Sequence, residues 1–254
     1  MAITIKSERE IELMAEAGKI LERVHNELEK ALHPGMSTKD IDTLGEEIIR
    51  SYGCIPSFLN YNGYPASICV SVNQEVVHGI PDKHRIIHEG DIVSLDAGVI
   101  YKGYHSDAAR THAVGEVSEE AKKLIQVTKE CFFEGIKYAK AGNHLFDISG
   151  AIGRYAEERG YGVVRDLCGH GIGTALHEAP EIPNYEVGRK GVRLRPGMTL
   201  AIEPMINIGT YEVDWLDDDW TVVTRDGSLS AHYENTILIT EGEPRILSLT
   251  CDNE

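Results

Sequence analysis

Basic residues are scarce relative to acidic ones in this chain of 254 residues. Lys and Arg number 25 against 41 for Asp and Glu, which gives a net charge of −16. Surfaces that bind nucleic acids or anionic membranes in a general way are rich in Lys and Arg. We therefore expect neither DNA nor a membrane as a partner, and only a local basic patch remains open.

Long apolar segments are absent as well. The N-terminal segment holds no apolar core of signal-peptide length, and no later run approaches the ~18 apolar residues that a membrane span needs. This absence predicts a cytoplasmic protein.

Cysteines are few, and their pattern is unlike that of a disulfide framework or a zinc knuckle. The five form an odd set without a C-x-x-C pair: Cys54, Cys69, Cys131, Cys168 and Cys251. Reduced thiols suit this set better, so any metal should use other ligands. With nine prolines and 42% hydrophobic residues, the chain is long enough for one large globular domain or two fused half-domains.

Apolar spacing predicts several helices and strands. Helices are expected at about residues 7–32, 37–51, 118–139 and 145–159, and Ser7 with Glu10 fits a capping box. From about residue 68 onward, short runs rich in Val and Ile are typical of strands.

Several residues recur at one offset, which indicates an internal repeat. Six pairs are separated by 107 positions: Gly35 and Gly142, Asp40 and Asp147, Ile41 and Ile148, Gly53 and Gly160, Gly90 and Gly197, and Asp96 and Glu203. Farther on, the motif ending at Asp107 matches the one ending at Glu234 at an offset of 127, so the second half carries about 20 extra residues in its hairpin. We expect one catalytic domain, 1–254, whose halves, approximately 1–115 and 116–254, are related by a two-fold axis. Chance matching of common Gly and Asp residues is the alternative.

Two acids interrupt a predicted hairpin in the first half. Asp96 lies in an apolar run, where an unpaired buried carboxylate is very costly. If Lys102–Gly103 forms the turn, Asp96 pairs with Ala109 and Asp107 pairs with Gly98. The two carboxylates then share one face of the hairpin as diagonal neighbours.

Glu203 and Glu234 repeat this anomaly in the second half. Each single acid has an ordinary explanation: Asp107 could pair with Arg110, and Glu203 could lie on a strand edge beside Pro204. Four symmetric carboxylates, however, would repel one another unless they protonate or bind cations. Two divalent ions would neutralise them.

Three histidines are candidates for the same site. His170 lies between glycines that permit close backbone approach, which makes it the candidate imidazole ligand. A mainly oxygen set with one imidazole suits Mn, Fe, Co or Zn, and bridging carboxylates can hold two ions ~3.5–4 Å apart for hydrolysis. His78, at a strand end, and His177 are candidate substrate contacts that could stabilise the tetrahedral intermediate, although a lone strand-end histidine is more often structural. The other eight histidines suggest no such role. The chain lacks G-x-S-x-G and H-E-x-x-H, which argues against serine and zincin hydrolases.

At these residues the chain resembles the type I methionine aminopeptidases of the creatinase/aminopeptidase superfamily. The likeness covers almost the whole chain. Its most specific segments are residues 69–81, 91–110, 169–185, 197–204 and 228–236. The resemblance implies an α+β "pita-bread" fold, with a central antiparallel sheet and outer helices in two pseudo-two-fold-related halves. It also implies removal of the initiator methionine from nascent polypeptides, with a small second residue preferred.

The resemblance assigns roles to the candidate residues. It makes Asp96 the terminal ligand of one metal, Asp107 and Glu234 the bridges, and His170 and Glu203 ligands of the other, with Glu203 also moving protons. His78 and His177 contact substrate. The implied methionine pocket contains Phe58, Tyr61, Tyr64, Cys69, Leu176 and Trp220, in which Phe58 and Leu176 depart from many relatives; as an alternative, the aromatic residues could simply cover the core.

The resemblance further implies a monovalent cation near Asn73 and Ser230 and transient proximity to the ribosome, and we expect a monomer. The acidic segment 214–220 should border the site without binding metal. Two other functions stay open. A proline-specific aminopeptidase of the same superfamily usually has an additional N-terminal domain, for which this chain has no room. A catalytically silent binding protein on this fold would be expected to lose ligand residues, whereas all five are present.

Overall fold

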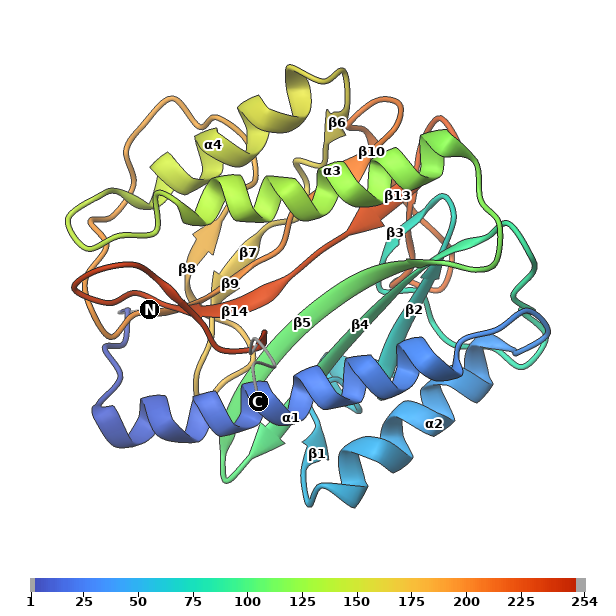
Figure 1. The fold of residues 1–254 in the computed structure, drawn as a ribbon, viewed down its shortest axis with the longest axis horizontal. Coiled ribbons are helices and arrows are strands. Elements are labelled where there is room, and N and C mark those ends of the chain that lie inside the picture. Colours follow the sequence, from blue (N-terminus) through green and yellow to red (C-terminus); the bar gives the residue numbers. More distant parts are fainter. Residues whose placement is uncertain (1–2, 250–254) are drawn as a thin grey trace.

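Four long helices form where the apolar spacing predicts them. In the computed structural model, which describes residues 3–249, they are α1 (Glu8–Ala31), α2 (Thr38–Ser51), α3 (Glu119–Ile136) and α4 (Leu145–Glu157). The Ser7 N–H donates a hydrogen bond to Glu10 Oε2 at 2.7 Å, so the predicted capping box starts α1. Figure 1 shows the pair α1–α2 on one side of the central strands and the pair α3–α4 on the other.

The strands form antiparallel sheets. One sheet joins β4 to β1, β2 and β5, and a second has the order β15-β14-β9-β7-β8. Two smaller sheets have the orders β13-β10-β6 and β11-β12-β3. In chain order the bounds are β1 (Ile55–Pro56), the 3-10 helix η1 (Tyr61–Gly63), β2 (Ile68–Val72), β3 (Glu75–Val77), β4 (Ile92–Tyr101), β5 (Tyr104–Ala113), β6 (Gly162–Val163), β7 (Gly169–Gly171), β8 (Glu178–Ile182), β9 (Thr199–Ile202), β10 (Met205–Asn207), β11 (Val213–Trp215), β12 (Val222–Thr224), β13 (Ser230–His232), β14 (Asn235–Leu238) and β15 (Arg245–Ile246).

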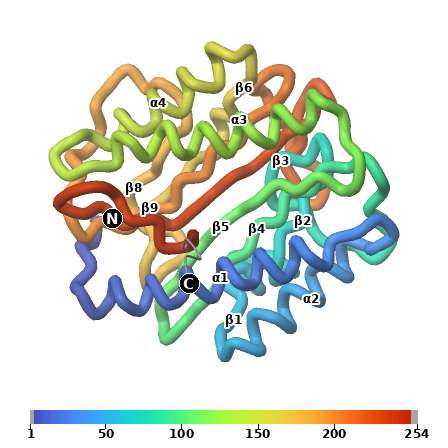
Figure 2. The backbone as a smooth tube through the Cα atoms, in the orientation of Figure 1, coloured from blue at the N-terminus to red at the C-terminus, as the bar shows by residue number. Residues whose placement is uncertain are grey.

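The two largest sheets meet at a seam between β5 and β14. Glu234 N–H donates to the Ala109 carbonyl at 3.0 Å, and Ala109 N–H donates to the Glu234 carbonyl at 3.4 Å. The Thr236 side chain accepts from Asp107 N–H and donates to the Asp107 carbonyl, both at 2.9 Å. The tube in Figure 2 shows the same two segments, far apart in sequence, running side by side. The seam therefore makes the central antiparallel layer continuous.

Corresponding residues of the repeat make corresponding contacts. Isolated bridges join Ser37 to Ile86 and His144 to Arg193, and each member of the second pair lies 107 positions after its counterpart. The glycine pairs of the repeat also have matching φ angles. These angles are 95° and 93° at Gly35 and Gly142, 72° and 83° at Gly53 and Gly160, and 92° and 86° at Gly90 and Gly197. A positive φ is a conformation that glycine adopts without steric cost. Chance matching does not account for shared backbone geometry.

Each helix pair covers its own hydrophobic core. One core is formed by α1 and α2 with β2, β4 and β5, and includes Leu21, Ile49 and Leu95, each fully buried. The other is formed mainly by α3 and α4 with strands of the second half, and includes Phe132 and Ile237. Because apolar burial is the main stabilising contribution to folding, each core supports one of the strand pairs that carry the acids.

Four strands, β10–β13, occupy the extra length that the repeat assigns to the second hairpin. They separate β9 from β14 in sequence, whereas a two-residue turn joins β4 directly to β5. β12 pairs with β3, so the insertion reaches across to the first half.

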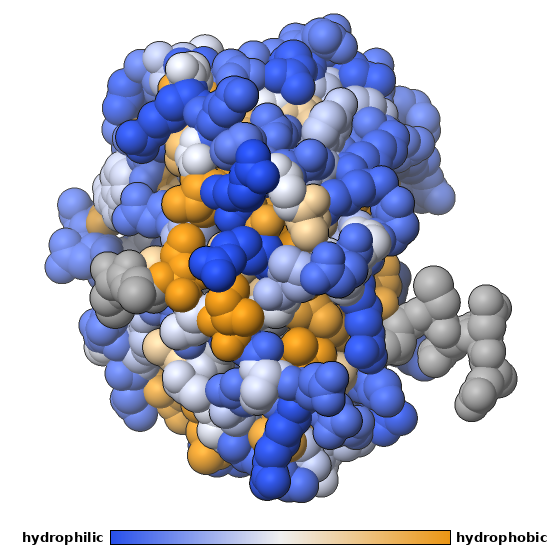
Figure 3. Space-filling model, turned by 90° about the vertical axis from the view of Figure 1, so that its left-hand side faces the viewer, coloured by the Kyte–Doolittle hydropathy of each residue, from blue (hydrophilic) through white to orange (hydrophobic). Residues whose placement is uncertain are grey.

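Hydrophilic residues cover much of the face shown in Figure 3, and the net charge of the chain is −16. On the face shown in Figure 3, apolar side chains gather in a broken band across the middle, with hydrophilic ones around it. None of the helices within residues 3–249 is long and apolar enough to cross a membrane. Cys54, Cys69, Cys131 and Cys168 are free thiols, and Cys251 lies outside the described residues.

Candidate metal centre

The β4–β5 hairpin has the predicted register. Asp96 lies opposite Ala109, and Asp107 lies opposite Gly98. The two carboxylates therefore project from one face of the hairpin as diagonal neighbours, and the Asp107 residue is 4% exposed. Asp107 does not pair with the nearby arginine: the Arg110 guanidinium donates to the Ala109 carbonyl at 2.7 Å and also to the Glu234 carbonyl.

The two glutamates lie just outside strands rather than within them, which corrects the prediction. Glu203 follows β9, and Glu234 precedes β14. Pro204 has no N–H to continue the strand, which explains why β9 ends there. Because Ile202 pairs with Asn235, the two glutamates are still brought together at the ends of adjacent strands.

His170 is held by a close approach of three backbone segments. A Cβ on Gly169 would lie 2.4 Å from the Ala201 carbonyl oxygen, and one on Gly171 would lie 2.2 Å from the Ala179 carbonyl oxygen. Only glycine fits at both positions. The ring donates through Nδ1 to the Gly171 carbonyl at 2.9 Å, because a carbonyl can only accept. Nε2 is then left with a lone pair, as a metal ligand requires.

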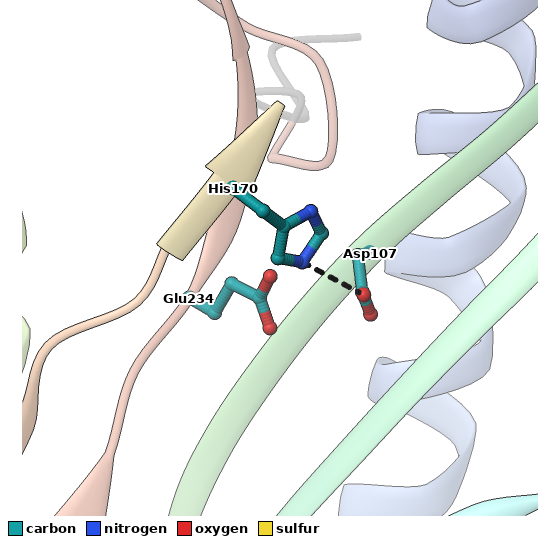
Figure 4. A group of neighbouring side chains, drawn as sticks. All are labelled: Asp107, His170 and Glu234. Atoms are coloured by element: carbon teal, nitrogen blue, oxygen red, sulfur yellow. Dashed lines mark ion pairs between the residues drawn. The ribbon is translucent and has the colours of Figure 1, made fainter. Parts of the chain in front are cut away.

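That nitrogen faces the acids. His170 Nε2 lies 3.8 Å from Asp107 Oδ2 and 3.7 Å from Glu203 Oε1. One ligand atom from each of Asp107, His170 and Glu234 lies within 4.8 Å of the others. Figure 4 shows these three side chains converging from separate segments of the chain. Such a convergence of two carboxylates and an imidazole is suited to a divalent transition-metal ion.

Unsatisfied oxygens provide a further test of the fit. Asp96 Oδ1, Asp107 Oδ1 and Glu234 Oε1 are buried, and none has a hydrogen-bond partner in the described part of the chain. Buried carboxylates without partners are costly, and a cation would satisfy all three. The residues therefore fit the metals that the resemblance implies.

Electrostatics lead to the same conclusion. Burial, and next the charge of Asp107, raise the pKa values of Asp96, Glu203 and Glu234 well above their ordinary range. Burial also raises the pKa of Asp107 to about 7. Burial lowers the pKa of His170 to about 3, so its ring is neutral at pH 7. Without cations the carboxylates must hold protons, and divalent ions would replace those protons.

A small pocket of about 140 Å³ opens above the acids. Its walls come from both halves of the chain, and Trp220 of the second half meets Tyr64 of the first edge-on, with ring centroids 5.1 Å apart. Every residue predicted for the site lines this pocket: Phe58, Tyr61, Tyr64, Cys69, His78, Asp96, Asp107, His170, Leu176, His177, Glu203, Trp220 and Glu234. The structure thus brings the whole predicted set together.

Two neutral histidines flank the pocket. His78 follows β3 with φ = 59°, a conformation uncommon for residues other than glycine, and lines the pocket. His177 Nδ1 lies 2.8 Å from the Tyr61 hydroxyl, and its ring centroid lies 4.1 Å from that of His170. Burial lowers the pKa of His78 to about 4 and lowers that of His177.

Several neighbouring residues were not predicted. Asn62 also lines the pocket, with φ = 49°. A larger, open cavity of about 620 Å³ adjoins it through His170 and His177 and is lined farther out by Phe146 and Arg189. His232, to which no role was assigned, lies with Nε2 3.7 Å from Glu203 Oε2. Its position before Glu234, matching that of His105 before Asp107, was the signal available in the sequence.

The acidic segment 214–220 borders the site as predicted. It spans most of the β11–β12 hairpin, in which Trp215 is 49% exposed, whereas Trp220 lines the pocket. Asp218 accepts hydrogen bonds from the N–H groups of Trp220 and Thr221 at 2.8 and 2.7 Å, which holds the indole in place.

Known proteins resemble this chain in sequence and in fold. A relative from Clostridium acetobutylicum named methionine aminopeptidase is 58% identical over 247 residues, 97% of this chain and 99% of that protein. The crystal structure of a methionine aminopeptidase from Thermotoga maritima has a TM-score of 0.96 at 47% identity and covers 98% of this chain and 100% of that one. A Xaa-Pro dipeptidase from Bacillus anthracis has a TM-score of 0.77 at 27% identity, with 97% of this chain but 62% of that one covered.

These likenesses confirm the predicted α+β pita-bread fold and the predicted resemblance to methionine aminopeptidases. Metallopeptidase family M24 matches residues 12–241, most of the chain and all five candidate ligands. By its fold and by this match, the chain belongs to metallopeptidase family M24.

Proposed function

We propose that this chain is a methionyl aminopeptidase, a metal-dependent exopeptidase that removes the initiator methionine from nascent polypeptides and prefers a small second residue. The observation that carries the proposal is an apolar pocket of about 140 Å³ with Asp107, His170 and Glu234 converging at its base. Full-length likeness to proteins named methionine aminopeptidase, at up to 58% identity, supports the same activity.

The metal centre in this proposal holds two divalent ions, Co, Mn, Fe or Zn. Asp96, Asp107, His170, Glu203 and Glu234 would hold these ions, in the roles that the resemblance assigns to them. Four carboxylates balance the charge of two divalent ions, and the unpartnered oxygens support this assignment. When bound, the ions supply Lewis-acid activation for peptide hydrolysis.

The protein's own groups would handle the substrate and the protons. His78 and His177, both neutral, can each donate one N–H to the peptide carbonyl or to the leaving nitrogen. The raised pKa of Glu203, caused by burial and by the charge of Asp107, suits a carboxyl group that accepts a proton and later returns it to the leaving nitrogen.

The methionine side chain would lie against apolar groups of both halves. Phe58, Tyr64, Cys69 and Leu176 are buried and belong to one hydrophobic cluster, against which Trp220 packs. Together with Tyr61 they form a narrow slot that suits an unbranched thioether. A β-branched side chain would have less room at its first carbon.

Further parts of the proposal concern partners and location. We place the protein in the cytoplasm as a monomer, with transient ribosome proximity, acting on polypeptide N-termini as one catalytic domain of two halves, about 1–115 and 116–254. A monovalent cation would lie near Asn73 and Ser230. Ser230 N–H donates to the Asn73 carbonyl at 2.9 Å, so these residues are adjacent, and the carbonyl oxygen retains a second lone pair.

Two other functions receive less support. A proline-specific peptidase shares the fold, but the Xaa-Pro dipeptidase is 27% identical to this chain, against 58% for the methionine aminopeptidase from Clostridium acetobutylicum. A silent binding protein would not need the five ligand positions that this chain retains.

Methionine release from Met-Ala-Ser tests the proposal. Chelator-stripped protein would be reconstituted with Mn, Fe, Co or Zn and assayed beside Leu-Ala-Ser and Ala-Pro-Ala. We expect metal-dependent cleavage of the methionyl peptide alone. Cleavage confined to Ala-Pro-Ala would transfer the assignment to the proline-specific branch, and no cleavage of any peptide would favour a binding protein.

A further inference from the structure

One buried imidazole beside the proposed ligands has no hydrogen-bond partner. His232, the last residue of β13, is 2% exposed. Both of its ring nitrogens are buried without a donor or acceptor among residues 3–249. Buried polar groups are nearly always paired, so each of these nitrogens requires a partner that its present hydrogen bonds within the described chain do not supply.

The backbone of His232 is held firmly by β5. His232 N–H donates to Thr111 Oγ1 at 2.9 Å, and the Thr111 hydroxyl donates to the His232 carbonyl at 2.9 Å. On its other side His232 pairs with Met205 of β10. The position of the ring is therefore determined by the sheet and not by a loop.

The ring faces a proposed metal ligand. Nε2 of His232 lies 3.7 Å from Glu203 Oε2, while Nε2 of His170 lies 3.7 Å from Glu203 Oε1. The Glu203 carboxylate thus lies between two imidazoles, one at each oxygen. His170 belongs to the tight group of potential ligand atoms with Asp107 and Glu234, and His232 does not.

We propose that His232 is a positioning residue whose Nε2–H donates to Glu203 Oε2 and orients that carboxylate for metal binding. This inference rests on the proposed metal centre. Closing 3.7 Å to hydrogen-bond length requires a side-chain movement of roughly 1 Å. An outer donor of this kind fixes the direction of the ligand and leaves its other oxygen free for the ion.

The other ring nitrogen has a separate environment. His232 also lines a cavity of about 300 Å³ between α1 and α3, together with His25 and His112. This rear cavity shares no lining residue with the methionine pocket, and it is large enough for water, which can hydrogen-bond to Nδ1. The alternative is that His232 serves only this cavity and does not affect Glu203.

A matched pair of variants separates the two roles. The side-chain amide of glutamine reaches about as far as Nε2 of histidine, whereas that of asparagine reaches only about as far as Nδ1. Chelator-stripped wild type, His232→Gln and His232→Asn would be titrated calorimetrically with Mn²⁺ and with Zn²⁺. Their kcat and KM for Met-Ala-Ser and their Tm values would be measured in parallel, with His112→Asn as a control in the same rear cavity.

We expect His232→Asn to weaken metal affinity by about 10- to 100-fold and to lower kcat, with KM within about twofold of wild type. His232→Gln should restore both affinity and kcat, and His112→Asn should match wild type.

Three results would overturn the inference. Equal metal affinity and kcat in wild type and both His232 variants would remove any role toward Glu203. Equal defects in both variants with a lowered Tm would make the residue structural, and loss of one whole metal equivalent would make it a ligand. If wild type itself binds no divalent ion, the proposed function fails together with this inference, whereas failure in the variants alone leaves the proposed function intact.

Discussion

The two hairpins that carry the acids differ in regularity although they place their carboxylates alike. In the first, a two-residue turn joins β4 to β5, and ten consecutive residue pairs run from Ile92 and Ala113 to Tyr101 and Tyr104. In the second, β10–β13 intervene between Glu203 and Glu234. The comparison shows which part of the repeat is constrained. The acids and the strands beside them are reproduced, and the connection between them is free to vary.

The inserted strands contribute features that the first hairpin lacks. They supply Trp220 to the pocket wall and His232 to the back of Glu203. They also pair with β3 of the first half. In the proposed function, the first hairpin is thus a regular support for two metal ligands, and the second would combine ligands with substrate contacts. Substitutions in the two hairpins should therefore have different consequences.

Glu203→Gln should have the largest effect. The repeat matches Glu203 with Asp96, but only the glutamate is assigned a proton-carrying role, so we expect kcat for Met-Ala-Ser to fall by roughly 10²- to 10⁴-fold while the protein stays folded. Glu212→Gln, a change in the same insertion at a half-buried residue that pairs with Arg225 away from the pocket, should leave kcat unaltered. Near wild-type turnover in Glu203→Gln would sink the role assignment.

Asp107→Asn should change how the Tm of the metal-free protein depends on pH, because it removes an ionisable group that is buried at the seam. The folded-state pKa of Asp107, raised by burial to about 7 from 3.8, lies above its unfolded value, so its contribution to stability is present at low pH and is lost as pH rises toward and through 7. Without metal, the Tm of Asp107→Asn relative to wild type should therefore increase between pH 5 and pH 8, by several degrees at ~2–4 °C per kcal/mol.

With divalent ions present, wild type should instead have a higher Tm than Asp107→Asn, because asparagine is a poorer ligand than a carboxylate. The exposed Asp217→Asn is the control and should change Tm equally at both pH values. A pH-independent difference between wild type and Asp107→Asn would contradict the proposed buried charge.

Trp220→Ala should raise KM for methionyl peptides by roughly tenfold, because an apolar wall of the pocket is lost, with a much smaller change in kcat. Trp215→Ala removes the exposed tryptophan of the same hairpin and should leave both constants near wild type. Steady-state kinetics on Met-Ala-Ser distinguishes the two variants. An equal response would mean that the insertion does not form the pocket wall.

Gly103→Ala, at the turn of the first hairpin, should have the smallest effect. Its φ of 87° is unfavourable for alanine, so we expect a loss of about 1 kcal/mol in the free energy of unfolding and unchanged kinetics. Gly242→Ala, where an added Cβ meets no atom within 4 Å, serves as the control. Denaturant unfolding measures both. A kinetic defect in Gly103→Ala would imply that the first hairpin does more than hold ligands.

The first hairpin could be predicted residue by residue because local rules determine it. A two-residue turn sets the register, and alternation then decides which side chains share a face. The helices followed in the same way from spacing and capping, as at Ser7 and Glu10. Polar residues in apolar strands identified Asp96, since a buried carboxylate requires a partner.

The remaining features depend on contacts between distant segments. The division into separate sheets, the seam at Ala109 and Glu234, and the orientation of Arg110 toward carbonyls all require knowledge of how the halves pack. His232 was missed for the same reason: its ring becomes notable only when Glu203, on another strand, lies beside it. Glu203 and Glu234 were predicted to lie within strands, but β9 and β14 are shorter, because Pro204 has no N–H with which to continue the pairing of the strands.

The seam between β5 and β14 would make the stability of the protein depend on bound metal. Asp107 and Glu234 approach one another across the junction between the halves, so one ion held by both would act as a removable cross-link between segments that are far apart in the sequence. Ligand binding to the folded state alone increases its population. In a cell, metal supply would then influence how much of this chain withstands proteolysis, as well as how fast it works.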